Sequence, residues 1–191
     1  MPYDTRGTLR RKMLKNTSDS YGWGARLFHW TMFLIIAGLI IGGNIISDMP
    51  AGPDKTTLLG MHKSFGVVIL FLAVCRLIWR LSNERPQDLG KSPLENRLGH
   101  AMHIFLYVLI LEQPVIGILM SQSLGYPVNF FNMATLPTFV EKNAQWATTL
   151  LNLHSATGGV LAVAVTLHAA AALKHHFIEK DRTLLRMMLG K

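Results

Sequence analysis

The sequence has 191 residues, half of them apolar and only 16% charged, and its formal net charge is +8. A soluble domain carries about 25% charged residues, so this composition indicates a single domain whose surface largely faces lipid. The single cysteine excludes an intrachain disulfide, covalent attachment of a c-type haem and metal sites built from several thiolates.

Residues 1–22 form a polar, basic segment that lacks the apolar core and cleavage site of a signal peptide, so we expect a cytoplasmic tail ahead of one domain at residues 23–191. The first apolar stretch, Leu27–Ser47, contains no Lys, Arg, Asp or Glu. Its length matches the roughly 20 residues that a helix needs to cross a bilayer. His29 lies near the start of this span, three residues after Arg26.

The second span is expected from about Thr57 to Leu81, with His62 near its start and Arg76 fourteen residues later. The third runs from about Pro93 to Ser121 and contains His100 and His103. It opens with the sequence Ser-Pro-Leu-Glu, which is typical of a capping box with proline at the first helical position.

A long, partly apolar loop from Gln122 to Ala147 is expected to lie along the outer membrane surface or to cap the bundle. The fourth span lies between Lys142 and Lys174 and contains His154 and His168. No stretch shows the period-two alternation of a barrel strand, so the predicted fold class is all-α, an integral membrane four-helix bundle.

The basic residues indicate how the bundle is oriented. All but three of the 19 lie in the N-terminal tail, around the connection between the second and third spans, or at the C-terminus. The exceptions are Lys55, Lys63 and Lys142. The positive-inside rule therefore predicts that both termini are cytoplasmic, which explains the net charge without a nucleic-acid partner.

The histidines form pairs when they are placed by depth. A lone histidine in a span is more often hydrogen-bonded to a neighbouring helix than it is a ligand. His62 and His154, however, each lie six residues past the expected start of their helix, and so at one depth near the outer face. His168 follows His154 by fourteen residues, about 21 Å along nearly the same helix face, and reaches the level of His29 near the inner face.

Two facing imidazoles suit the axial positions of a haem iron, whereas zinc and copper favour three or four ligands at one depth. The spacing therefore predicts two haems, between His62 and His154 and between His29 and His168. His103 is the main rival ligand at the inner level. Gly66 and Gly158, one turn after their histidines, leave space for a flat porphyrin or serve ordinary close packing of membrane helices.

The inner end of the bundle carries further polar groups. Arg76 at the inner haem level is predicted to contact a haem propionate or a quinone, or else to extend to the lipid headgroups. His175 lies seven residues after His168 and is predicted to hydrogen-bond a quinone or to supply its protons. His103 and His100 are further candidates for contact with a quinone or a haem.

Several motifs carry a family resemblance that spans about Trp23 to the C-terminus. They are Arg-Leu-Phe-His29-Trp, His62-Lys-Ser-x-Gly, Gly-His100-x-x-His103 and His168-Ala-Ala-Ala-Ala-Leu-Lys-His175. As a set they are similar to the bacterial cytochrome b561 family. The resemblance implies a four-helix bundle in the bacterial inner membrane, with two haems b bound by the four paired histidines. Some members resemble superoxide:ubiquinone oxidoreductases, which implies superoxide as an electron donor and ubiquinone as the acceptor.

We therefore expect an electron-transfer oxidoreductase. Electrons would pass from a donor at the outer face, through the two haems, to a quinone near Arg76 and His175. The alternative is a haem-containing membrane anchor that relays electrons for a separate dehydrogenase, which would co-purify with it. A histidine-lined metal transporter is a weaker third reading, because it requires a continuous polar pore and no haem absorbance.

Overall fold

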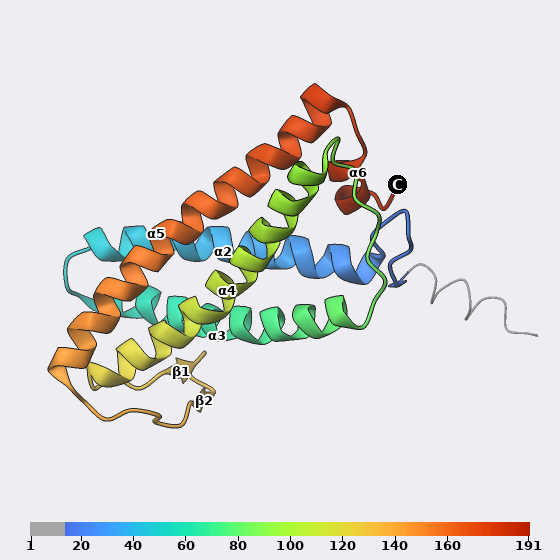
Figure 1. The fold of residues 1–191 in the computed structure, drawn as a ribbon. Coiled ribbons are helices and arrows are strands. Elements are labelled where there is room, and N and C mark those ends of the chain that lie inside the picture. The colour runs from blue at the N-terminus through green and yellow to red at the C-terminus, as the bar shows by residue number, and fades with distance from the viewer. Residues whose placement is uncertain (1–13) are drawn as a thin grey trace, which may run out of the picture.

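The computed structural model describes residues 14–191, so most of the predicted basic tail lies outside the described residues. The chain forms four long helices, α2 (Trp23–Asp48), α3 (Pro53–Leu81), α4 (Pro93–Ser123) and α5 (Ala144–Lys174). A single π-helical turn, η1 (His175–Glu179), continues α5, and a short helix, α6 (Thr183–Met188), follows it. Figure 1 shows α2 beside α3 and α4 beside α5.

All four long helices have the length and apolar composition to cross a membrane. Large apolar side chains point outward along them; Leu34, Phe71 and Val163 are each at least 60% exposed. Apolar surface on this scale is unfavourable in water and suits the hydrocarbon layer, where helices satisfy their own backbone hydrogen bonds. The prediction of an all-α, four-helix membrane bundle is therefore confirmed.

The buried core lies between the two histidine levels. On α3 it includes Ile69 and Ala73, which follow His62 in the chain, and on α5 it includes Leu161 and Ala164, which lie between His154 and His168. Each helix packs against the next one in the chain, α2 on α3, α3 on α4 and α4 on α5. The remaining core residues are Met32, Ile36, Leu106, Leu109 and Ile110. An apolar layer thus separates His62 and His154, which lie nearer the α4–α5 connection and which we call the outer pair after the predicted orientation, from His29 and His168, which we call the inner pair.

Two helices begin earlier than the sequence predicted. α3 starts at Pro53 rather than near Thr57, and α5 starts at Ala144 rather than near Thr148. His62 is therefore about 14 Å and His154 about 15 Å from the start of its helix. Because both helices extend by one turn, the two histidines still reach the same depth.

The start of α4 carries the predicted capping interactions in modified form. The Ser92 hydroxyl accepts a hydrogen bond from the Glu95 backbone N–H at 3.2 Å. The Glu95 carboxylate accepts from the backbone N–H of Lys91, at 2.8 Å from its Oε2, rather than from that of Ser92. This leaves Glu95 Oε1 free to face α5.

The connection between α4 and α5 caps the bundle at what we call the loop end. It contains a short antiparallel hairpin that was not predicted from the sequence. Its strands, β1 (Asn129–Phe130) and β2 (Ala134–Thr135), have two residues each. The buried Ser64 of α3 anchors it. The Ser64 hydroxyl accepts from Phe131 N at 2.9 Å and lies within donating distance of the carbonyl oxygens of Gly60 and Asn129, at 2.9 and 3.1 Å.

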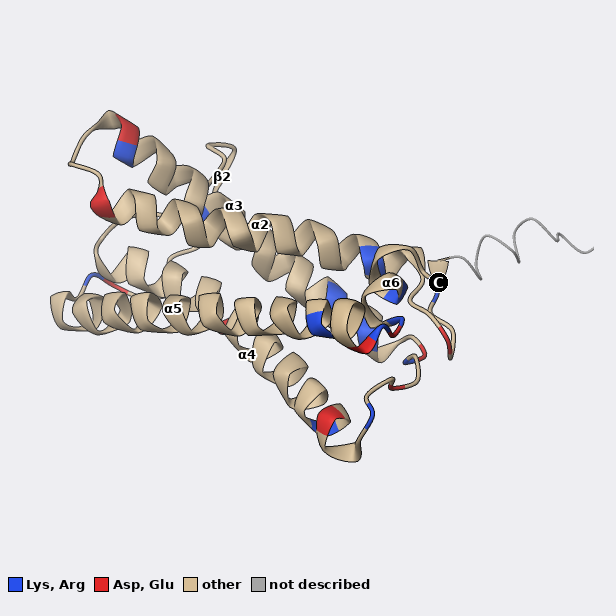
Figure 2. Cartoon of the chain, turned by 90° about the horizontal axis from the view of Figure 1, so that it is seen from above, with Lys and Arg blue, Asp and Glu red and all other residues tan. Residues whose placement is uncertain are grey.

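The opposite end, which we call the termini end, holds both ends of the described chain and most of its charged residues (Figure 2). Here α6 returns to the start of α2. Trp30 Nε1 donates to Met187 O at 3.0 Å, and Arg26 Nη2 donates to Met188 O at 2.7 Å. Arg186 of α6 is buried and donates to Gln87 O at 2.7 Å. The C-terminal segment therefore closes the bundle at this end.

We predict that Ser64→Ala loosens the hairpin. The substitution removes the acceptor for Phe131 N–H and the donor for Asn129 O, and an unsatisfied buried polar group costs about 1–3 kcal/mol. The rate of limited proteolysis within residues 124–143 should rise about tenfold. Ser82→Ala is the matched control, because the Ser82 hydroxyl bonds only within its own helix end. Equal cleavage rates in the two variants would contradict the anchoring role of Ser64.

Candidate functional site

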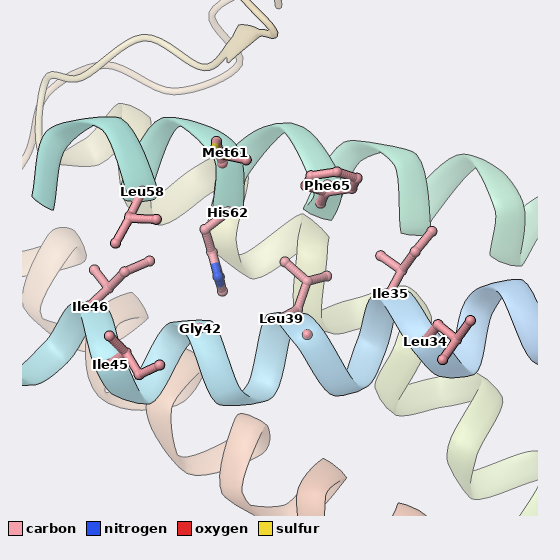
Figure 3. A pocket seen from close by; sticks show the side chains of 11 residues that line it. Leu34, Ile35, Leu39, Gly42, Ile45, Ile46, Leu58, Met61, His62 and Phe65 are labelled. Atoms are coloured by element: carbon pink, nitrogen blue, oxygen red, sulfur yellow. The ribbon is translucent and has the colours of Figure 1, made fainter. Parts of the chain in front are cut away.

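The outer histidines meet between α3 and α5. The ring centroids of His62 and His154 are 6.3 Å apart, with 77° between the ring planes. Nδ1 of each ring is buried and has no hydrogen-bond partner among residues 14–191. Figure 3 shows His62 projecting from α3 toward α2 into a groove of about 420 Å³. Apart from this imidazole, aliphatic and aromatic side chains, Met61 and two glycines line the groove.

Three histidines and one arginine gather at the inner level. The His29 and His168 rings are 6.1 Å apart, and the His103 and His168 rings are 5.3 Å apart. Arg76 Nη2 donates to His29 Nδ1 at 3.0 Å, so Arg76 lies at the predicted depth. In this arrangement the neutral His29 ring carries its own proton on Nε2. Because two rings flank His168, His103 remains a rival to His29 as its partner.

Both predicted pairs fit a metal ion placed between two imidazoles. Two metal–imidazole bonds of about 2 Å on opposite sides of an ion leave the ring centroids roughly 6 Å apart. The observed separations are 6.3 Å at the outer level and 6.1 Å at the inner level. At the outer level alone, the buried Nδ1 atoms of both rings lack a hydrogen-bond partner among residues 14–191, and a buried polar nitrogen without a partner costs free energy. The donor set and its spacing therefore suit a bis-histidine haem.

Two further glycines, besides Gly66 and Gly158, lie against the outer histidine pair. A Cβ on Gly158 would lie 3.0 Å from Gln113 Nε2, whereas a Cβ on Gly66 would have no other atom within 4 Å. By contrast, a Cβ on Gly117 would lie 3.0 Å from His154 Cε1, and one on Gly43 would lie 3.3 Å from His62 Cε1. Gly117 and Gly43 thus make room for the imidazoles themselves.

Gln113 positions the helix segment that carries His154. Its Nε2 donates to His154 O at 2.8 Å, and its Oε1 accepts a short hydrogen bond from the Thr157 hydroxyl. These bonds tie α4 to α5 at the outer level. No sequence pattern indicated this role, because a glutamine beside Pro114 in an apolar span can hydrogen-bond to any of the neighbouring helices.

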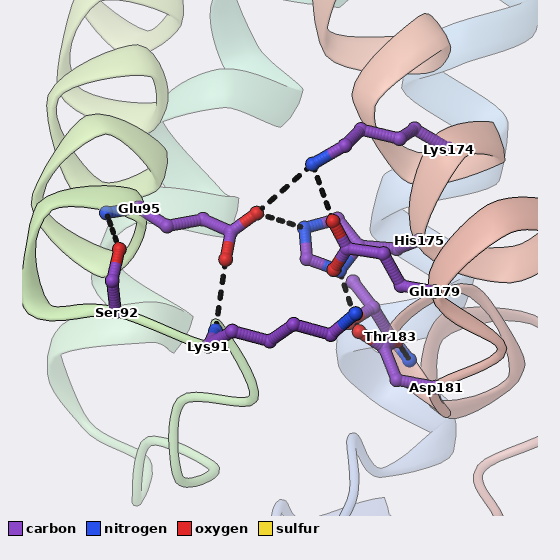
Figure 4. Close-up of polar contacts among 8 residues, drawn as sticks. All are labelled: Lys91, Ser92, Glu95, Lys174, His175, Glu179, Asp181 and Thr183. Carbon is purple, nitrogen blue, oxygen red and sulfur yellow. Dashed lines mark hydrogen bonds and ion pairs between the residues drawn. The ribbon is translucent and has the colours of Figure 1, made fainter.

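His175 and His100 lie at the termini end and bond to carboxylates. His175 Nδ1 is 2.5 Å from Asp181 Oδ2 and 3.1 Å from Glu179 Oε2, and its Nε2 is 3.7 Å from Glu95 Oε1 (Figure 4). His100 Nε2 is 2.9 Å from Asp88 Oδ1 in the connection between α3 and α4. Sequence analysis missed these partners, since they come from connections and from a neighbouring helix.

The Asp181 carboxylate is held in its charged form. Partial burial raises the pKa of this group, but hydrogen bonds from Thr183 and His175 outweigh burial and keep the pKa below its ordinary value. The negative charge next to His175 is therefore maintained at neutral pH.

Comparisons with known proteins show what the chain is similar to. A family model described as prokaryotic cytochrome b561 matches residues 20–190. Cytochrome b561 homolog 2 of Escherichia coli (strain K12) is 32% identical over 180 residues, which cover 92% of this chain and 94% of the relative. Cytochrome b561 homolog 1 of the same organism is 30% identical, over 84% of this chain and 92% of the relative. The probable superoxide oxidase CybB of Yersinia pestis is 32% identical, over 85% of this chain and 92% of the relative.

We predict that Gly117→Ala disturbs the outer histidine pair selectively. The added methyl group would press on His154 Cε1 and displace the ring. The absorption spectrum and the haem content of the purified variant should show loss or weakening of one haem. Gly159→Ala is the matched control, because nothing lies within 4 Å of a Cβ at that position on α5. A Gly117→Ala variant with the wild-type spectrum would contradict the close approach.

Proposed function

The chain belongs to the prokaryotic cytochrome b561 family, a family of membrane electron-transfer proteins with b-type haem, and on this premise we propose that it holds two such haems and moves electrons across the bacterial inner membrane to ubiquinone. The observation that most directly supports two haems is that histidine rings meet at two levels, with ring centroids 6.3 Å apart for His62 and His154 and 6.1 Å apart for His29 and His168. Both termini lie on the cytoplasmic side in this proposal, as the distribution of basic residues indicates.

The four paired histidines are the proposed axial ligands. His62 and His154 hold the outer haem, and His29 and His168 hold the inner one. A haem bound by two imidazoles exchanges one electron at a time between its ferric and ferrous states. Ligation through Nε2 of His29 requires the ring proton to lie on Nδ1, which then no longer accepts from Arg76. The guanidinium of Arg76 is thereby freed for an anionic or carbonyl oxygen.

The loop end is the proposed site of the electron donor. Lys63 follows the ligand His62, and its ammonium lies 5.7 Å from the Tyr126 ring centroid and 3.5 Å from Pro127 O. A fixed cation beside the outer haem site attracts a small anion. The Yersinia pestis relative is named as a probable superoxide oxidase, which makes superoxide the anion that we infer. Carboxylates on the same face limit this attraction to short range; they are Asp48, Asp54 and Glu141.

The termini end is the proposed site of quinone reduction. Arg76 and Arg80 both lie over the Tyr107 ring, at 5.6 and 5.5 Å from its centroid. This cationic and aromatic surface beside His103 suits the oxygens and the ring of a quinone. Reduction of a quinone to a quinol takes two electrons and two protons. His175, with its carboxylate neighbours, is the proposed source of those protons.

We predict that the purified protein contains two haems b per chain. His154→Ala and His168→Ala should each lose about one haem, because each removes one ligand of a different pair. His103→Ala separates the rival assignment, since it should keep both haems if His29 is the inner ligand. Haem quantitation with difference spectra measures all three. Retention of both haems in His154→Ala, or loss of one in His103→Ala, would contradict the proposed ligand set.

We predict that Arg76→Gln slows electron delivery to ubiquinone about tenfold or more, since a hydrogen bond from a charged group contributes about 1.5–3 kcal/mol. Superoxide should still reduce the haems of the variant at the wild-type rate. Stopped-flow spectra of haem reduction and reoxidation measure both steps. Arg85→Gln serves as control, because Arg85 pairs with the exposed Asp88. Wild-type reoxidation in Arg76→Gln would remove Arg76 from the quinone site.

A further inference from the structure

We propose that the termini end holds a binding site for a divalent transition-metal cation of the zinc type, formed by Glu95, His175 and Glu179. The inference goes beyond electron transfer and does not depend on it, although a cation on His175 would occupy the side chain that is proposed above as a proton source, so the two roles exclude each other at any one time. One ligand atom from each of the three residues lies within 4.8 Å of the others. The residues come from the start of α4 and from the π-helical turn η1, so a bound cation would join these two elements.

Two carboxylates of the cluster are held in place by backbone N–H groups. Lys91 N donates to Glu95 Oε2 at 2.8 Å, which directs Glu95 Oε1 toward His175. Thr183 N donates to Asp181 Oδ1 at 2.8 Å, which directs Asp181 Oδ2 toward His175 Nδ1. Figure 4 shows these carboxylates approaching the imidazole from opposite sides. The donor atoms are thus arranged before any ligand binds.

Asp181 sets the tautomer of His175. With its Oδ2 2.5 Å from Nδ1, the carboxylate accepts the Nδ1–H, which leaves Nε2, 3.7 Å from Glu95 Oε1, as the ring nitrogen that a metal would bind in place of a proton. A histidine that ligates a metal commonly donates its other N–H to a carboxylate in this way. The backbone supports the arrangement, because Lys180 at φ 57° turns the chain and Asp181 N donates to His175 O at 3.1 Å.

Glu179 supplies an independent sign of a missing cation. Its side chain is only 7% exposed, and its buried Oε2 makes no hydrogen bond within the described part of the chain. This oxygen is 3.1 Å from His175 Nδ1, whose N–H is directed to the closer Asp181 Oδ2, while the other oxygen of Glu179, Oε1, pairs with Lys174. A buried carboxylate oxygen without a donor is costly. A bound cation would satisfy it.

The charges of the cluster favour the same conclusion. The three carboxylates of Glu95, Glu179 and Asp181 surround the His175 imidazole. The cluster contains a single ammonium, that of Lys174, which lies between Glu95 and Glu179 and pairs with both. The Lys174 side chain is 51% exposed and can extend into solvent, so it competes with a metal without blocking it. One nitrogen and two or three oxygens at this spacing suit zinc, whereas calcium takes six to eight oxygens.

The test is zinc binding by the full-length, haem-containing protein in detergent, measured by equilibrium dialysis and elemental analysis. One zinc per chain is expected for the wild type. Glu95→Gln and Glu179→Gln should each remove that zinc. Asp181→Asn should weaken binding 10–100-fold, as for other partners of a ligating histidine. Lys174→Met should bind zinc more tightly, because the competing ammonium is gone.

His176→Gln is the matched control and should bind zinc as the wild type does, because the neighbouring His176 lies outside the cluster. Absence of zinc from the wild type, or zinc that survives both Glu95→Gln and Glu179→Gln, would overturn the proposal. The haem spectrum of each variant shows that it has folded. That spectrum also separates the two ideas, since a failed zinc site leaves both haems in place and a failed haem assignment leaves the zinc result unaffected.

Discussion

A polar nitrogen inside the hydrocarbon layer needs a partner, because no water is there to hydrogen-bond it. The interior of this bundle contains two pairs of imidazoles and the further ring of His103, and the two outer rings each keep a buried nitrogen without a partner among residues 14–191. The rest of the architecture follows from this constraint. The helices α3 and α5 run in the same direction and bring His62 to His154, whereas α2 runs opposite to α5 and brings His29 to His168. An apolar core keeps the two levels apart.

The polar groups around the pairs divide the molecule into two ends with different chemistry. At the loop end, Ser64 anchors the hairpin and Gln113 ties α4 to α5 beside His154. At the termini end, Arg76 contacts His29, and a set of carboxylates surrounds His175. Charge is sparse at the first end and dense at the second (Figure 2). This asymmetry matches an electron donor that arrives from one side of the membrane and an acceptor that needs protons from the other.

Much of the fold was predictable, because long apolar runs and a capping sequence indicate membrane helices directly. The histidine levels were also predictable. The starts of α3 and α5 were each misplaced by about one turn in the same direction, so the relative depth of His62 and His154 was unaffected. The role of these histidines as haem ligands remains a prediction from spacing and family.

Other features depend on contacts that no local pattern encodes. Gly43 and Gly117 lie against the outer histidines only because of how α2 and α4 are rotated about their axes. Lipid-facing residues are apolar as well as buried ones, so the sequence does not show which face of each helix points inward. The carboxylates around His175 come from α4, from η1 and from the connection before α6. Neither the short hairpin nor these contacts follow from periodicity.

The most direct test of the central claim, that two histidine pairs each hold a haem, is electron paramagnetic resonance of the oxidised protein. The account predicts two low-spin ferric signals, both from haem iron with two imidazole ligands, and predicts that His62→Ala abolishes one while the other is unchanged. A single low-spin signal in the wild type, or a high-spin signal from iron with one histidine, would contradict it.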